Sequence, residues 1–150
     1  MITAAVAIEL LLGAKYAWGM FDRILQSEYG FAATETQLVF SMTVTLFAVG
    51  FLLSGRLQDR FGPRVTTATG ALLYGGGLVV AGLGGPRFAT LFIGAGVMLG
   101  LGVAFAYIGP MATAVKWFPR RKGVATGIVI AGYGGGAFFV SAAGPAEADA

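Results

Sequence analysis

The stretch Gly55–Arg64, GRLQDRFGPR, carries four charges in ten residues, whereas the segments on either side of it are uncharged. The uncharged segments run from Gln37 to Ser54 and from Val65 to Pro86. A helix rises 1.5 Å per residue, so about 20 apolar residues cross the hydrocarbon core of a bilayer. The pattern therefore predicts two membrane-spanning helices joined by a short ionic connection.

The composition of the whole chain points to the same solvent. Hydrophobic residues make up 57% of the 150 residues and charged residues only 11%, whereas a soluble domain carries about 25% charged residues. We therefore predict an all-α integral membrane protein with five transmembrane helices. The expected spans are residues 2–22, 37–55, 65–86, 88–115 and 123–143, and residues 144–150 are expected to form a tail outside the membrane.

Several classes of function are excluded by the residue types. The chain has no Cys and no His, and it offers no catalytic set or metal-ligand cluster, so we predict neither an enzyme nor a metal site. Residues 132–137 fit the pattern G-x-G-x-x-A, but they lie in an apolar helical segment rather than after a strand, so no nucleotide cofactor is predicted. The net charge of +3 is small and the basic residues are scattered along the chain, which argues against nucleic-acid binding.

The basic residues predict an orientation. Seven Lys and Arg residues fall in two connections, and only two fall in the connections of the other face. The first group comprises Arg56, Arg60, Arg64, Lys116, Arg120, Arg121 and Lys122; the second comprises Arg23 and Arg87. Because Lys and Arg accumulate in cytoplasmic loops, we predict a multi-pass protein of the cell (inner) membrane with a cytoplasmic N-terminus.

Glycines and turn residues indicate how the helices pack and end. The pairs Gly96/Gly100, Gly123/Gly127 and Gly132/Gly136 have the spacing that lets helix backbones approach closely in lipid. Residues 34–37, TETQ, have capping-box spacing at the start of the second span. Residues 62–63, Gly-Pro, predict a tight turn before the third span.

Lys15 is the most informative charge, because it falls well inside the first span beside Tyr16 and Trp18. A charged side chain in hydrocarbon costs roughly 2.5–3.5 kcal/mol on insertion scales. One interpretation is that Lys15 faces a polar cavity and attracts an anion, with Tyr16 and Trp18 beside the site. The other is that Lys15 reaches the interface or pairs with a residue of another helix. Glu9, six positions earlier, does not share its helix face; for Glu9 the two alternatives are a position facing an interior cavity and one close to the cytoplasmic surface.

Tyr107 is a further candidate site residue. It lies three residues before Pro110, and a proline inside a helix leaves the carbonyl four residues earlier, that of Ala106, without its donor. A phenol beside a freed carbonyl is suited to a cavity wall. The alternative is an ordinary packing tyrosine with a satisfied hydroxyl.

The charged stretch also carries a family resemblance. GRLQDRFGPR resembles the signature G-x-x-x-D-R-x-G-x-R between the second and third helices of the major facilitator superfamily, with matches at Gly55, Asp59, Arg60, Gly62 and Arg64. The resemblance implies the N-terminal half bundle of a carrier that works by alternating access, with this motif as a cytoplasmic gate. In such a gate, Asp59 accepts hydrogen bonds from a helix N-terminus while the arginines bridge to partner carboxylates or lipid phosphates.

Two more stretches narrow the resemblance. Residues 13–21, GAKYAWGMF, and residues 116–136, KWFPRRKGVATGIVIAGYGGG, are similar to the oxalate/formate antiporter-like branch, which is related to monocarboxylate transporters. This implies a small organic anion as substrate, such as oxalate, formate or another monocarboxylate, with Tyr16 and Tyr107 near a central carboxylate site. Lys15 departs from the branch, where a polar uncharged residue is expected.

The length differs from the family pattern. The family has twelve helices in two halves with the substrate route between them, whereas five spans are predicted here. A missing C-terminal half is therefore an expected partner, together with the lipid bilayer. The alternative hypothesis is a non-transporting membrane fragment that only associates with other helices.

Overall fold

The structure, a computed structural model, describes residues 2–13, 15, 18–85 and 87–143, and every regular element among them is a helix. The order along the chain is α1 (Ile2–Gly13), α2 (Trp18–Tyr29), α3 (Ala33–Leu83), α4 (Phe88–Leu91), the π-helix η2 (Phe92–Met98), α5 (Leu99–Trp117) and α6 (Lys122–Ala143). The predicted all-α class is confirmed. Within the described residues, three stretches are long and apolar enough to cross a membrane: Thr3–Tyr29, Ala33–Leu83 and Phe88–Trp117.

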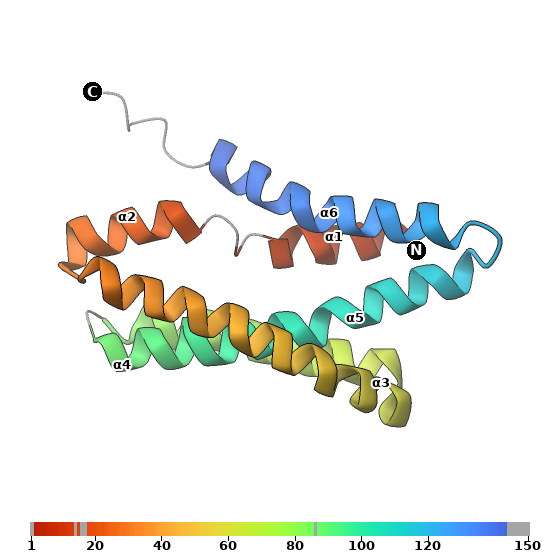
Figure 1. Cartoon of the computed structure of the whole chain (residues 1–150), viewed down its shortest axis with the longest axis horizontal. Helices are drawn as coiled ribbons and strands as arrows, with labels where there is room; N and C mark the ends of the chain where they lie inside the picture. The colour runs from red at the N-terminus through yellow and green to blue at the C-terminus, as the bar shows by residue number, and fades with distance from the viewer. Residues whose placement is uncertain (1, 14, 16–17, 86, 144–150) are drawn as a thin grey trace.

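Helix α3 contains the charged stretch and folds back on itself there (Figure 1). A straight helix of its 51 residues would be about 77 Å long, more than twice the hydrocarbon thickness of about 30 Å. Gly62 departs from helical geometry, with φ 82° and ψ 167°, and Pro63 follows it. Because glycine lacks a Cβ, it adopts this conformation without the steric cost that other residues meet. The turn at residues 62–63 lies where the sequence predicted it, although helical structure continues closer to the turn than expected.

The start of α3 differs from the sequence prediction. The helix begins at Ala33, and the backbone N–H of Ala32 donates a hydrogen bond of 3.0 Å to the Glu35 carboxylate. The acceptor is thus Glu35 rather than Gln37, and the capping box is shifted two residues toward the N-terminus. A carboxylate accepts more strongly than an amide and is favoured by the helix dipole in the first turn, which explains the preference.

The segment expected as the first span is divided between α1 and α2. Its helical part extends to Tyr29, beyond the expected end at residue 22. A hydropathy criterion stops at the first charges, but α2 continues because its polar residues satisfy one another: Gln26 Nε2 donates to Asp22 Oδ1 at 2.8 Å, one turn apart. Such i, i+4 pairs stabilise a helix where it leaves the membrane.

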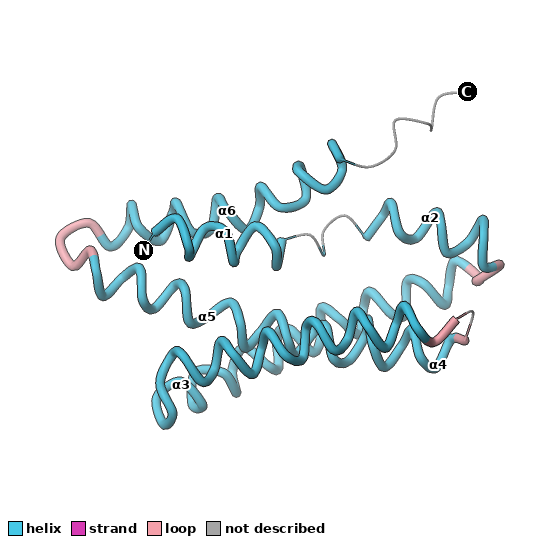
Figure 2. The backbone as a smooth tube through the Cα atoms, turned by 180° about the vertical axis from the view of Figure 1, so that it is seen from behind, coloured by secondary structure: helices cyan, strands magenta, loops and turns pink. Residues whose placement is uncertain are grey.

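The connections segregate by charge (Figures 1 and 2). The bend of α3, the α5–α6 connection and the N-terminus lie at one end of the bundle, whereas the α2–α3 and α3–α4 connections lie at the opposite end. The first end therefore carries the two connections with the seven basic residues named above. The fold is consistent with the grouping of the loops that the sequence predicted.

Two sets of glycines bring helix backbones together. Helix α3 packs on η2 and α5, and we call this contact the α3–α5 seam. A Cβ on Gly70 would overlap the backbone of Ala106, and one on Gly102 would overlap that of Tyr74. A Cβ on Gly136 would overlap the backbone of α1 and one on Gly132 would make tight contact with Val6 of α1, whereas nothing lies within 4 Å of a Cβ built at Gly123 or Gly127. The predicted role in packing holds for Gly132/Gly136 and is wrong for Gly123/Gly127, because the N-terminal part of α6 turns that face away from the bundle.

The π-helix η2 lies within the segment expected as one regular span. A π-helix leaves carbonyls with poor intrahelical donors. The Thr43 hydroxyl of α3 lies 2.9 Å from the Ala95 carbonyl of η2 and 2.8 Å from the Val39 carbonyl of its own helix, so its one proton is shared between them. Thr43 thereby connects the first leg of α3 to η2.

Candidate functional site

Lys15 lies between α1 and α2 with its side chain only 8% exposed. Its Nζ is 3.9 Å from the centroid of the Phe47 ring and 5.6 Å from that of Tyr133. Phe47 comes from α3 and Tyr133 from α6. Aromatic faces carry partial negative charge and stabilise a desolvated ammonium by about 2 kcal/mol or more. The fold therefore holds the predicted cation inside the bundle rather than at the lipid surface.

Tyr107 belongs to the same aromatic cluster. Its ring is edge-on to Tyr133 at 5.0 Å between centroids and edge-on to Phe47 at 6.0 Å. Lys15 and Tyr107 thus share two neighbours, although they come from segments more than ninety residues apart. Tyr16, the third residue predicted at this place, lies outside the described residues.

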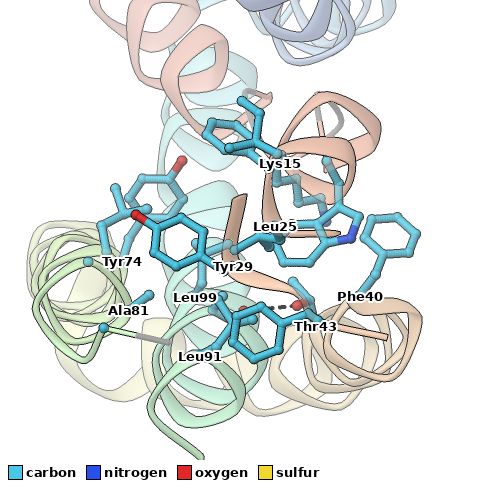
Figure 3. A pocket seen from close by; sticks show the side chains of 17 residues that line it. Lys15, Leu25, Tyr29, Phe40, Thr43, Tyr74, Ala81, Leu91 and Leu99 are labelled. Atoms are coloured by element: carbon cyan, nitrogen blue, oxygen red, sulfur yellow. Dashed lines mark hydrogen bonds between the residues drawn. The ribbon is translucent and has the colours of Figure 1, made fainter. Parts of the chain in front are cut away.

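Lys15 also lines a cavity of about 540 Å³ between α2, α3, η2 and α5 (Figure 3). Figure 3 shows Lys15 on the side of the cavity opposite Leu91 and Thr43. Most of the wall is apolar, and the polar groups are few. The lining residues with a polar side-chain atom are Lys15, Trp18, Tyr29, Thr43 and Tyr74. Among the lining residues, Lys15 supplies the cationic group.

Trp18 contributes a hydrogen-bond donor to this region. Its ring stacks on Phe40 with the centroids 6.1 Å apart, which fixes the orientation of the indole. Its Nε1 is buried and has no acceptor among the residues that the structure describes. A buried N–H without an acceptor is costly, so such a group is suited to an incoming anionic oxygen. Trp18 and Lys15 are three residues apart, and both line the cavity.

Tyr74 closes another side of the cavity. Its hydroxyl donates a hydrogen bond of 3.1 Å to the Leu11 carbonyl, near the end of α1. The bond ties the second leg of α3 to α1 and leaves the hydroxyl oxygen able to accept.

The charged motif lies apart from the cavity. Asp59, Arg60 and Arg64 are exposed at the bend of α3, and none of them lines the cavity. The guanidinium carbon of Arg60 is 5.3 Å from the centroid of the Phe61 ring. The structure therefore separates two sets of predicted residues: Lys15, Trp18 and Tyr107 inside the bundle, and Gly55, Asp59, Arg60, Gly62 and Arg64 at its end.

Phe47 and Tyr133 were not among the residues predicted from the sequence. A signal for Phe47 was available, because Phe40, Phe47 and Phe51 are spaced by seven and four residues and so share one face of a helix. On that face, Phe40 stacks on Trp18 and Phe47 contacts the Lys15 ammonium. No comparable periodicity marks Tyr133, which lies among glycines.

Comparisons with known proteins place the chain in a family. The profile of the Major Facilitator Superfamily matches residues 4–149. The uncharacterized MFS-type transporter YhjX of Escherichia coli is 31% identical over 134 residues, which cover 89% of this chain and 33% of that protein. The oxalate:formate antiporter of Oxalobacter formigenes is 28% identical over 137 residues, which cover 89% of this chain and 32% of the antiporter.

Animal relatives are similar over the same region. Monocarboxylate transporter 3 of Mus musculus is 31% identical over 120 residues, covering 80% of this chain and 24% of that protein. The chain spans about a third of the length of the first two relatives, at 33% and 32%. The match to residues 4–149, the helical fold and the motif at the bend of α3 agree with one another. The chain therefore belongs to the major facilitator superfamily, in the branch that resembles the oxalate:formate antiporter and the monocarboxylate transporters.

Proposed function

We propose that this chain forms part of a secondary carrier for small organic anions, and that the Lys15 ammonium binds the substrate carboxylate. The observation that carries the proposal is a buried cation at the wall of a largely apolar cavity. A desolvated ammonium gains most from a charged acceptor, because charge-assisted hydrogen bonds are roughly twice as strong as neutral ones. The Trp18 indole N–H supplies a second donor among the residues that line the cavity.

The cavity favours monocarboxylates over oxalate. One cationic group in an apolar wall can neutralise one carboxylate, whereas the second charge of a dicarboxylate would lie against rings and aliphatic side chains. An anion with one carboxylate and a small apolar body satisfies both parts of the wall. The names of two relatives, an oxalate:formate antiporter and a monocarboxylate transporter, support the class of small organic anions for this chain as well.

In this proposal the carrier operates by alternating access against a second half of the transporter, in a cell (inner) membrane with the N-terminus in the cytoplasm. Support for the orientation comes from the basic connections at the end that carries the bend of α3. Asp59, Arg60 and Arg64 at this bend are then cytoplasmic and serve as the gate, with partners outside the cavity. Tyr16 and Tyr107 complete the substrate site.

The proposal is tested by anion binding to the chain in lipid nanodiscs. Labelled pyruvate, formate and oxalate are compared by equilibrium dialysis for the wild type, Lys15→Met and the matched control Lys116→Met, which changes an exposed lysine at the end of α5. Loss of a hydrogen bond to a charged group costs about 1.5–3 kcal/mol, so we expect Lys15→Met to weaken pyruvate binding roughly 10- to 150-fold. The control should bind as the wild type does.

Equal binding by the wild type and Lys15→Met would contradict the site, and oxalate binding more tightly than pyruvate would contradict the monocarboxylate preference. Counterflow in liposomes then addresses transport. If the chain binds pyruvate but gives no counterflow, the alternative of a non-transporting fragment describes the chain by itself.

A further inference from the structure

Glu9 is a buried acid that the anion site does not use. Its side chain has 0% exposure, and among the described residues neither carboxylate oxygen has a hydrogen-bond partner. The sequence left open whether Glu9 faces the interior, and the structure buries its side chain completely. An ionised carboxylate without hydrogen bonds or a counter-ion in an apolar interior loses its hydration at a cost of several kcal/mol.

Glu9 lies where α1 packs on both α5 and α6. Ala5 and Leu12, one turn away on either side along α1, are both buried. They belong to two different clusters that include residues of α5 and α6. The partners of Ala5 are Ala114, Ala125 and Val129, and those of Leu12 are Leu99, Val103, Ala106 and Tyr133. Glu9 is therefore the acidic member of a continuous apolar contact among three helices.

Helix α5, on which α1 packs, contains a carbonyl without its usual helical donor. Pro110 lies inside α5 and has no N–H, so the carbonyl of Ala106 lacks its usual helical partner. Ala106 is 1% exposed and packs in the cluster of Leu12, one turn from Glu9. A neutral carboxylic acid can donate its O–H to such a carbonyl, whereas a carboxylate can only accept and is repelled by it.

The other titratable groups described on the three helices have surroundings of their own. Helix α5 contributes Tyr107 and Lys116, and α6 contributes Lys122 and Tyr133. The two lysines are exposed at the end of the bundle, and the two tyrosines are packed against each other. The Lys15 ammonium, six residues along from Glu9, lies against the rings of Phe47 and Tyr133.

We propose that Glu9 is a proton-binding site, separate from the anion site, which holds a proton as a neutral carboxylic acid while α1 packs on α5 and α6. When this packing opens, the O–H bond breaks, water takes the proton, and the hydrated carboxylate remains on α1. Occupancy by the proton thus favours the packed arrangement, and loss of the proton favours the opened one. The proposal does not depend on which anion the cavity binds, or on whether it binds one.

Infrared spectroscopy of the chain in lipid nanodiscs tests the bound proton directly. We expect the wild type at neutral pH to show the C=O stretch of a protonated carboxylic acid, which we assign to Glu9. The band should be lost in Glu9→Gln, which keeps the size and the neutral charge of the protonated side chain. It should be retained in the control Glu28→Gln, which makes the same change at an exposed residue of α2.

A wild-type spectrum without the band, or a band that persists in Glu9→Gln, would overturn the proposal. If Glu9→Gln does not fold, the carboxyl ¹³C shift of the Glu9 side chain in the wild type gives the same answer by solid-state NMR. A second readout is the protection of the α1 amides relative to their base-catalysed intrinsic exchange rates. We expect this protection to fall as the pH is raised in the wild type and to stay constant in Glu9→Gln. None of these measurements contains an anion substrate, so their failure is distinguishable from failure of the anion site.

Discussion

The α3–α5 seam and helix α2 both line the cavity, but they are built in opposite ways. Along the seam, glycines bring backbones so close that a single added methyl group would overlap the facing helix. Helix α2 has no buried residue along its length and contributes to the cavity through side chains that are partly or largely exposed. Stability within a protein follows the density of such contacts. The comparison indicates a rigid wall, made by α3, η2 and α5, that faces a wall with much less packing to hold it.

In the proposed carrier, alternating access would need one element that keeps its geometry while another moves. Lys15 precedes the loosely packed α2, but its ammonium lies against Phe47 of α3, on the rigid side. The hydroxyl of Thr43 and the aliphatic wall opposite also belong to the rigid side. The site therefore joins two parts of the bundle with unequal packing density.

The largest effect is expected from filling the seam. Gly70→Val places a side chain where even a Cβ overlaps Ala106 of α5. Overpacking costs about 1–3 kcal/mol and occasionally more, and backbone contact leaves little room for relaxation here. We expect a lower midpoint in thermal unfolding followed by circular dichroism in detergent. The control Gly75→Val lies in the same helix with open space around it, and equal effects of the two substitutions would remove the distinction between the walls.

A smaller effect is expected at the bend that brings the two legs of α3 to the seam. Gly62 has φ 82° and ψ 167°, a region that glycine alone adopts readily. Gly62→Ala should cost about 1–3 kcal/mol of strain, even though nothing lies within 4 Å of the added Cβ. The matched change is Gly55→Ala, in the same motif but within the helix, where alanine is favoured by about 0.5–1 kcal/mol. Chemical unfolding of both variants in micelles measures the difference, and a neutral Gly62→Ala would show that the bend is set by packing alone.

The smallest effect is expected at the bond between α3 and η2. Thr43→Val keeps the shape of the side chain and removes the proton that the Ala95 and Val39 carbonyls share. A net loss of about 1 kcal/mol follows from one hydrogen bond. Thr45→Val serves as the control, because Thr45 is exposed and bonds only to Ser41 of its own helix. Faster amide exchange in η2 for Thr43→Val alone would place this bond in the rigid wall, and identical exchange profiles would exclude it.

The sequence predicted the parts of the fold that depend on local chemistry. Apolar runs of sufficient length predicted helices, Gly62 followed by Pro63 predicted the turn, and the basic residues predicted which connections share an end. The π-helix η2 was not predicted, because its apolar residues do not differ in hydropathy from those of an α-helix, and its hydrogen bond from Thr43 comes from a residue more than fifty positions away. The extension of the N-terminal helices to Tyr29 was missed because hydropathy does not register polar pairs such as Gln26 with Asp22.

The sequence identified the charged candidate residue of the site, Lys15, but not the aromatic residues that surround it. A lysine in an apolar span is visible in any sequence, since its cost in lipid is large. Its contacts with Phe47 and Tyr133 depend on how three helices meet, and so does the burial of Glu9. The roles of Lys15, Tyr16, Trp18 and Tyr107 in binding remain predictions that the substitution at Lys15 addresses first.

The π-helix η2 affects which residues of α5, the helix that follows it, face the interior of the bundle. Each residue of an α-helix turns the chain by about 100°, so the wide turn at Phe92–Met98 resets the angular phase of α5 relative to α4. An i→i+5 turn holds about one residue more than an i→i+4 turn. Deleting one residue there would therefore allow a regular helix while leaving the face that carries Leu99 and Tyr107 nearly in place. The wide turn is thus a place where the chain can gain or lose one residue without exchanging the side chains that α5 presents to the interior.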